Sequence, residues 1–140
     1  MAAKYFVDTN ILIYAHDRRA GEKHERAREV VERLWDTGEG VLSTQVLQEL
    51  SINLRRKVAV PLSTKEIRNL VRDYMAWDVV VNGPVSILEA LDVQERHDMS
   101  FWDALILQAA NTSGATILYS EDLADGQKYG TVQVVNPLKT

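Results

Sequence analysis

Four acidic side chains, spread along the chain, are the residues best suited to chemistry in this sequence. They are Asp8, Glu49, Asp103 and Asp122. Closely spaced carboxylates repel one another, so such a cluster either has raised pKa values or binds a cation, and metal binding is the more economical explanation. Because oxygen ligands favour hard ions, a cluster of these side chains predicts a site for Mg²⁺ or Mn²⁺.

The composition does not favour other metal chemistry. The chain has no cysteine, which excludes a disulfide framework, a thiolate nucleophile and a cysteine-based zinc site. The three histidines, His16, His24 and His97, show no paired ligand spacing, and we expect them on the surface or as capping residues. A metal ion would therefore be held by oxygen atoms.

Each acid, taken alone, has a simpler structural role. Asp8 can cap a helix over residues 9–15, Asp122 can belong to a polar turn, and Glu49 can be an exposed helical glutamate. Asp103 lies in SFWDALILQAA, a helix that is apolar on nearly every side and is expected to pack within the protein. A carboxylate there needs a metal ion, a basic partner or the N–H groups of the first helical turn. Ser100 and Asp103 also fit the S-x-x-D form of a capping box.

The elements that position these acids follow from the alternation of β-rich runs and amphipathic helical patterns, which indicates parallel βαβ units. Strands are predicted over residues 5–7, 41–42, 79–81, 116–119 and 132–135. Helices are predicted over residues 9–15, 22–36 and 44–57, with further helices beginning at Ser63, near Pro84 and at Ser100. We expect one α/β domain over residues 1–140, a three-layer α/β/α sandwich with a mainly parallel sheet of about five strands.

Ligands of open α/β sheets gather at the carboxyl ends of the strands. Asp8 and Asp122 follow predicted strands, whereas Glu49 and Asp103 lie in the early turns of helices that should pack at the same edge. We therefore expect the four carboxylates to converge.

The charge balance argues against a protein that wraps duplex DNA, because the formal net charge is −4. A nuclease remains compatible with this charge, since bound cations neutralise the acids and basic groups can line the approach. Candidates for such basic groups are Arg18, Arg19, Arg55, Arg56 and Lys57. The sequence shows neither a signal peptide nor an apolar run of membrane-spanning length, so we expect a cytoplasmic protein without membrane contact.

Four segments occur in the order and approximate spacing of a known family. They are FVDTNILIYA, STQVLQEL, SFWDALILQAA and LYSEDLADGQKYG, and each carries one of the four acids; the closing VVNP is also similar. In these segments the chain resembles the PIN-domain ribonucleases, and specifically the VapC-like toxins of type II toxin–antitoxin pairs. The resemblance covers nearly the whole chain.

The resemblance implies that Asp8, Glu49, Asp103 and Asp122 hold one or two Mg²⁺ or Mn²⁺ ions, with Asp8 and Asp103 as the preferred direct ligands. Asn10 and Ser120 match polar positions that support the site in the family, and Ser120 stands where threonine is common. Glu121 is a neighbouring acid, and we prefer Asp122 as the one that faces the metal.

The resemblance also implies partners: an RNA substrate, a cognate antitoxin that occludes the site, and a second copy of the chain in a homodimer. The apolar residues Trp35, Trp77, Val60 and Leu62 are candidates for such surfaces, although burial in the core is the simpler role for each.

The expected reaction is hydrolysis of an RNA phosphodiester bond by metal-activated water attacking in line, which leaves 3′-hydroxyl and 5′-phosphate ends. Single-stranded or looped RNA is the expected substrate. One alternative is a catalytically weak PIN-like domain that binds RNA or a partner. Another is an aspartate-based phosphatase or receiver domain, but Asn10 breaks the D-x-D pattern of the phosphatase and Lys128 lies beyond a glycine-bearing turn.

Overall fold

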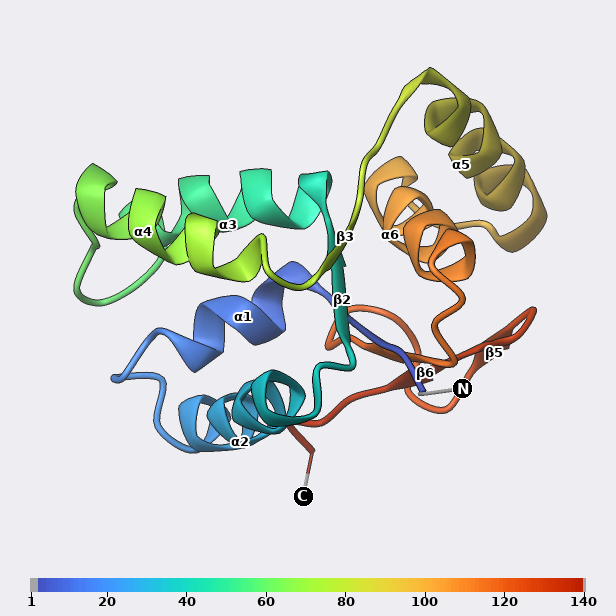
Figure 1. Ribbon diagram of the computed structural model, residues 1–140. Helices are drawn as coiled ribbons and strands as arrows, with labels where there is room; N and C mark the ends of the chain where they lie inside the picture. Colours follow the sequence, from blue (N-terminus) through green and yellow to red (C-terminus); the bar gives the residue numbers. More distant parts are fainter. Residues whose placement is uncertain (1–2, 140) are drawn as a thin grey trace.

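A computed structural model describes residues 3–139, and its helices and strands alternate as the sequence predicts (Figure 1). The elements are β1 (Tyr5–Val7), α1 (Thr9–Ala15), α2 (Glu22–Thr37), β2 (Gly40–Ser43), α3 (Thr44–Arg56), α4 (Thr64–Tyr74), β3 (Asp78–Val80), α5 (Pro84–His97), α6 (Phe101–Thr112), β4 (Ile117–Tyr119), β5 (Lys128–Tyr129) and β6 (Val132–Val135). The five predicted strands and six predicted helices are all present. The short strand β5 is an addition to the prediction.

The sheet has the strand order β3-β2-β1-β4-β6-β5. All neighbouring strands pair in parallel except β5, which is antiparallel to β6. The chain moves outward from β1 to β2 and β3, and it then crosses back to add β4 on the other side of β1. The direction of winding therefore changes between β1 and β4, where ligands of such sheets bind.

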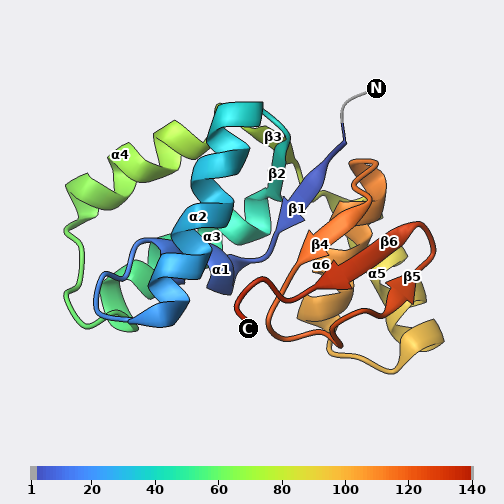
Figure 2. The same ribbon diagram turned by 90° about the horizontal axis from the view of Figure 1, so that it is seen from below.

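The helices form two layers with the sheet between them. Figures 1 and 2 show α1 to α4 on one side of the sheet and α5 with α6 on the other. This arrangement confirms the predicted α/β/α sandwich. It also places the first residues of α1, α3 and α6 near the carboxyl ends of the strands.

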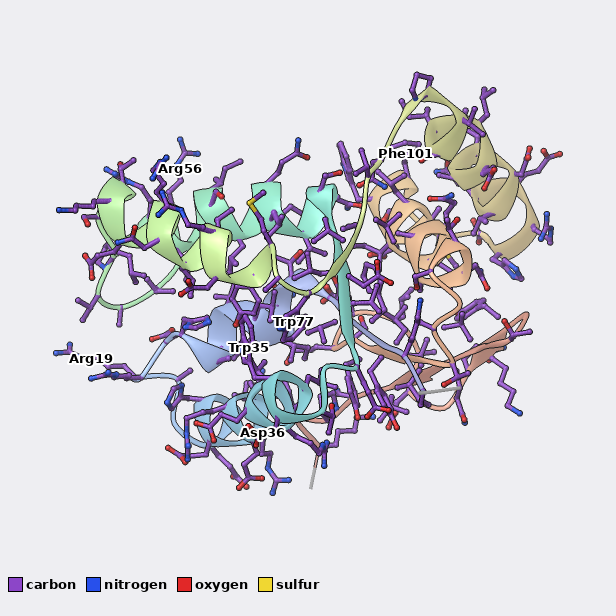
Figure 3. The ribbon with its side chains drawn as sticks, in the orientation of Figure 1. Arg19, Trp35, Asp36, Arg56, Trp77 and Phe101 are labelled. Atoms are coloured by element: carbon purple, nitrogen blue, oxygen red, sulfur yellow. The ribbon has the colours of Figure 1, made fainter. Side chains whose placement is uncertain are left out.

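The core lies between the sheet and both helical layers, and it includes fully buried side chains such as Phe6, Leu42 and Leu118. Tyr74, Trp35 and Trp77 form an aromatic cluster with ring centroids 5.1–5.4 Å apart (Figure 3). Trp77 is buried, whereas Trp35 and Val60 are exposed. Leu62 is half-buried.

Local signals account for several helix boundaries. Ser63 caps α4, and the reciprocal bond from its backbone N–H to Glu66 completes a capping box. Gly38 ends α2 in the left-handed conformation that glycine adopts without strain. None of the helices described within residues 3–139 is long and apolar enough to cross a membrane.

Candidate active site at the carboxyl ends of β1 and β4

The chain positions a group of polar residues where the winding of the sheet changes direction. Asp8 follows β1, and its backbone N–H donates a 3.0 Å hydrogen bond to the carbonyl oxygen of Tyr119, the last residue of β4. Ser120 follows directly. The segments that carry two of the predicted acids, Asp8 and Asp122, are therefore held side by side by the sheet itself.

A cavity of about 180 Å³ opens at this position. All four predicted carboxylates, from Asp8, Glu49, Asp103 and Asp122, line it. The other lining residues are mostly polar, and they are Thr9, Asn10, Gln45, Asn53, Lys57, Trp102 and Ile106. The structure thus brings together the four acids from four separate segments of the chain.

Asp8 is the N-cap of α1, as its position allows, and it also lines the cavity. Its Oδ1 accepts a 2.7 Å hydrogen bond from the N–H of Thr9, and its Oδ2 accepts a 2.9 Å bond from the Ser120 hydroxyl. The net pKa of Asp8 is raised to about 7, chiefly by burial and to a smaller extent by the negative charges of Asp122 and Glu49, although these two bonds lower it. A cation in the cavity would favour the ionised carboxylate.

Glu49 is half-buried and is not the exposed helical glutamate that its position alone allows. Its Oε1 accepts a 2.7 Å hydrogen bond from the Thr9 hydroxyl. Thr9 and Asp8 are consecutive, so this bond ties the second turn of α3 to the start of α1. The sequence prediction did not include Thr9, because its contact depends on how α1 and α3 pack.

Asp103 lies in the first turn of α6. Of the two hydrogen bonds of the predicted capping box, the described residues form only the one to the Ser100 hydroxyl. Ser100 caps the helix by accepting a 3.1 Å hydrogen bond from the Asp103 N–H. The Asp103 carboxylate lines the cavity instead of returning to the Ser100 backbone. The capping function therefore belongs to Ser100, and it leaves the acid available.

The adjacent acids Glu121 and Asp122 have different partners. Asp122 accepts a 3.1 Å hydrogen bond from the Asn10 amide and lines the cavity. Partial burial raises the pKa of Asp122, with further contributions from the charges of Asp103 and Glu121.

Glu121 points to a separate cluster. It accepts a 3.0 Å hydrogen bond from the Tyr14 hydroxyl and forms a 2.7 Å ion pair with Lys23. The preference for Asp122 over Glu121 as the acid of the site agrees with this arrangement.

Ser120 is fully buried and organises the loop after β4. Its hydroxyl oxygen accepts hydrogen bonds from the N–H groups of Asp122 and Leu123, at 3.2 and 3.4 Å, while it donates to Asp8. Ser120 and Asn10 thus contact two of the acids directly, which suits the supporting positions expected for them.

The donor set of the cavity suits a hard divalent cation. Its four acids supply only oxygen, and Mg²⁺ is commonly held by one or two carboxylates together with water. Within residues 3–139, no three histidine or acidic side chains stand close enough together to surround one ion. Three of the acids instead point an oxygen at Ser120, Thr9 or Asn10.

The histidines lie apart from the cavity. His16 contacts the Tyr74 hydroxyl at 2.7 Å, His24 contacts the Tyr14 carbonyl oxygen at 2.9 Å, and His97 packs against the Tyr129 ring. His16 ends α1 as its C-cap, in line with the expected capping role. Nitrogen ligation of the kind that zinc prefers is therefore not offered by the residues around the four acids.

Of the basic residues proposed from the sequence to line the approach to the site, some lie at the carboxylate cavity and others lie away from it. Lys57 lines the carboxylate cavity, whereas Arg18 and Arg19 line a separate hollow beside Trp35 and Tyr74. Arg19 lies far from Phe101, the first residue of α6 (Figure 3). Arg55 bonds to the Thr64 hydroxyl and so joins α3 to α4.

The expectation that α6 is packed within the protein is wrong at its first turn. Residues from Ala104 to Ala110 are buried, but the side chain of Trp102 is 61% exposed. The helix is covered along most of its length, and its beginning emerges beside the cavity. The apolar composition alone did not distinguish these two parts.

Comparisons with known proteins agree with this architecture. The family model of the PIN domain matches residues 5–124. No curated protein matches the sequence.

Several solved structures share the fold. One is the toxin VapC20 from Mycobacterium tuberculosis, described as cleaving the sarcin-ricin loop, with 22% identity, a TM-score of 0.67, and coverage of 85% of this chain and 90% of that one. Another is a toxin–antitoxin complex from Klebsiella pneumoniae, with 16% identity, a TM-score of 0.71, and coverage of 97% and 98%. A third is DNA-bound VapBC from Salmonella typhimurium, with 14% identity, a TM-score of 0.64, and coverage of 95% and 97%.

The matched region contains both strands at the switch in winding and all four acids of the cavity. The chain belongs to the PIN domain family.

Proposed function

We propose that this chain is a ribonuclease that depends on Mg²⁺ or Mn²⁺ and acts as the toxin of a toxin–antitoxin pair. The observation that carries the proposal is the convergence of Asp8, Glu49, Asp103 and Asp122 on one small cavity at the carboxyl ends of β1 and β4. Carboxylates from four distant segments line the same cavity, and a bound cation would offset their mutual repulsion. We assign one catalytic domain to residues 1–140.

Asp8 and Asp103 are the preferred ligands, with Glu49 and Asp122 completing the acidic site. When bound, a divalent cation supplies electrostatic stabilisation of the phosphate and lowers the pKa of a water molecule that it holds. The residues of the chain keep the carboxylates oriented: Ser120 for Asp8, Thr9 for Glu49 and Asn10 for Asp122. Lys57, on the wall of the same cavity, offers a positive charge for a phosphate oxygen.

The relatives with solved structures support the biological setting of this proposal. Their described assemblies include toxin–antitoxin complexes, two of which are VapBC proteins bound to DNA. We accordingly propose a cognate antitoxin that occludes the carboxylate cavity, a homodimer, RNA as substrate, and a cytoplasmic location.

The rival functions fit the site less well. An aspartate-based phosphatase would need a second acid at position 10, where Asn10 instead donates a hydrogen bond to Asp122. A receiver domain would need a lysine beside the central strands, whereas Lys128 lies in β5 at the edge of the sheet. A binding domain without activity is the remaining alternative, and the presence of all four acids in the cavity argues against it.

The test uses purified protein without antitoxin and end-labelled total RNA, in the presence of Mg²⁺, Mn²⁺ or EDTA. We expect metal-dependent cleavage that falls at least about 100-fold in both Asp8→Asn and Asp103→Asn, because each change removes a charge that stabilises the bound cation. End-group analysis should find 5′-phosphate and 3′-hydroxyl termini. Cleavage that persists in EDTA, or in both variants, would contradict the assignment.

A further inference from the structure

Trp102 is an exposed aromatic side chain at the edge of the candidate active site. Its side chain is 61% exposed, whereas Trp35 and Trp77 pack against each other and against Tyr74. The aromatic ring recorded near Trp102 is that of Phe101, at 5.3 Å between centroids and nearly perpendicular. The outer face of a large indole is therefore left in contact with water, where a planar ligand could stack on it.

Trp102 also belongs to the wall of the carboxylate cavity. It precedes Asp103, and both residues line that cavity together with Gln45. The first turn of α6 is fixed to α3, since the Gln45 amide donates a 3.2 Å hydrogen bond to the Trp102 carbonyl oxygen. Figure 3 labels Phe101 at this end of α6, beside the beginning of α3.

Gln45 is itself held firmly within the protein. It is only 4% exposed, and its amide nitrogen makes the bond to the Trp102 carbonyl oxygen. Its Oε1 is enclosed and has no hydrogen-bond partner among the residues that the structure describes. The amide therefore fixes the Trp102 backbone from a buried position.

Electrostatics alone gives this site little attraction for RNA. The chain carries a formal net charge of −4, and Lys57 is the one basic residue that lines the cavity within residues 3–139. Binding of a polyanion must then rely on interactions other than phosphate neutralisation. Stacking of bases on aromatic side chains supplies such an interaction in proteins that bind single strands.

We propose that Trp102 is a base-stacking platform for single-stranded RNA, on which a nucleobase next to the cleaved phosphate lies, and that Gln45 positions it. The inference rests on the proposed ribonuclease function and names the contact by which that site takes its substrate. Because Trp102 and Asp103 are consecutive, a base stacked on the indole holds its own phosphate near the carboxylates. A second copy of the chain is the other occupant that an exposed indole allows, but the mostly polar lining of the cavity favours a nucleotide.

The test measures binding of a short fluorescein-labelled single-stranded RNA by anisotropy, with Ca²⁺ in place of Mg²⁺ to slow cleavage. The second ligand is a set of RNAs of the same sequence, each of which has a single abasic nucleotide at a different position. We expect Trp102→Ala to weaken binding of the intact RNA by about 5- to 150-fold, the range for stacking of one base. Trp102→Phe should restore part of this affinity because it keeps an aromatic face.

The decisive measurement is the energetic coupling between Trp102 and one nucleobase of the RNA, obtained from the four binding affinities of a double-mutant cycle. For one abasic position, wild-type protein should lose about as much affinity as Trp102→Ala loses with the intact RNA, and the variant should lose nothing more. Gln45→Met should reduce this coupling, because it removes the hydrogen bond that holds the Trp102 backbone. Leu88→Ala, which changes an equally exposed apolar residue on α5, is the matched control and should bind like wild type.

Three outcomes would overturn the inference. If wild type binds and cleaves RNA while Trp102→Ala binds every RNA equally well, the stacking platform is wrong and the ribonuclease assignment stands. If Trp102→Ala shifts the sedimentation coefficient from dimer to monomer and shows no coupling to any abasic position, the indole belongs to an interface between copies. Failure of wild type to bind or cleave any RNA would instead remove the proposed function and this inference together.

Discussion

The hydroxyl of Ser120 donates a 2.9 Å hydrogen bond to Oδ2 of Asp8, and it thereby joins the loop after β4 to the loop after β1. Both residues are buried. The same hydroxyl oxygen accepts from the backbone of Asp122, so one small side chain positions two acids of the candidate site. This link explains how acids far apart in the sequence keep a fixed relationship.

Ser120→Ala should both destabilise the fold and impair cleavage. The change leaves a buried oxygen of Asp8 without a donor and two backbone N–H groups without an acceptor, at a cost of about 1–3 kcal/mol in the free energy of unfolding. We expect cleavage to fall about 10- to 100-fold, as for other residues that orient metal ligands. Urea unfolding and the RNA assay measure the two effects.

Two control variants sharpen this prediction. Ser120→Thr keeps the hydroxyl and should retain most of the activity. Ser51→Ala removes a hydroxyl that bonds to the Leu47 carbonyl oxygen within α3, and we expect it to change stability by less than about 0.5 kcal/mol. Equal effects of Ser120→Ala and Ser51→Ala would show that the contact with Asp8 has no special importance.

The stability of the metal-free protein should depend on the protonation of Asp8. Burial raises the pKa of Asp8 from 3.8 to about 7, so the folded state binds this proton more tightly than the unfolded chain does. The resulting stabilisation is complete below pH 3.8 and is lost as the pH rises through 7. Asp8→Asn does not titrate, and it should therefore gain about 2–4 kcal/mol relative to wild type between pH 4 and pH 8.

Urea unfolding in metal-free buffer at several pH values checks this expectation. Added Mg²⁺ at pH 8 should narrow the difference between wild type and Asp8→Asn, because the cation favours the ionised carboxylate. A difference that stays constant with pH would mean that Asp8 keeps an ordinary pKa in the folded protein.

Adjacent acids should respond differently to loss of charge. Asp122→Asn should reduce cleavage at least about 10-fold, because Asp122 lines the cavity beside Asp103. Glu121→Gln should stay within about 3-fold of wild type, because the Glu121 carboxylate bonds to Tyr14 and Lys23 outside the cavity. Cleavage rates at saturating Mg²⁺ measure both, and the reverse ranking would exchange the roles of the two residues.

Gly40→Ala should destabilise the fold because β2 passes close to Trp77. A Cβ atom at Gly40 would lie 2.6 Å from the indole ring, which is buried in the aromatic cluster and has little room to move. We expect a loss of about 1–3 kcal/mol, typical of overpacking, measured by urea unfolding.

Gly83→Ser is the matched control for this glycine substitution. A Cβ atom at Gly83 meets nothing within 4 Å, and the backbone there is extended. Because Gly83 is the N-cap of α5 and serine is favoured at that position, we expect a neutral or slightly stabilising change. Equal destabilisation by both substitutions would show that contact with Trp77 is not the cause.

The sequence was sufficient for the main elements because their patterns are local. Parallel strands such as Ile117–Tyr119 are apolar runs, and amphipathic helices such as Glu22–Thr37 repeat with the helical period. The strand Lys128–Tyr129 escaped prediction, since two residues form no alternation and their pairing with β6 depends on the turn between them.

The convergence of the acids was predictable for a different reason. Asp8 and Asp122 follow strands, and the carboxyl ends of parallel strands meet at one edge of the sheet whatever the detailed packing. The contacts of Thr9 and Gln45 were not predictable, because they depend on how α1, α3 and α6 meet in space. The exposure of Trp102 could not be predicted for the same reason, because the rest of its helix is largely buried.

The dispersal of the site over four segments has a consequence during protein synthesis. A ribosome that has translated the chain as far as Asp103 has produced three of the four carboxylates, but β4, which holds Asp8 through the backbone of Tyr119, has yet to form. The nascent polypeptide therefore lacks the complete carboxylate cavity until β4 and Asp122 have emerged. On the proposed function, a cell that makes this toxin can supply the antitoxin during the synthesis of all the segments that precede Asp122.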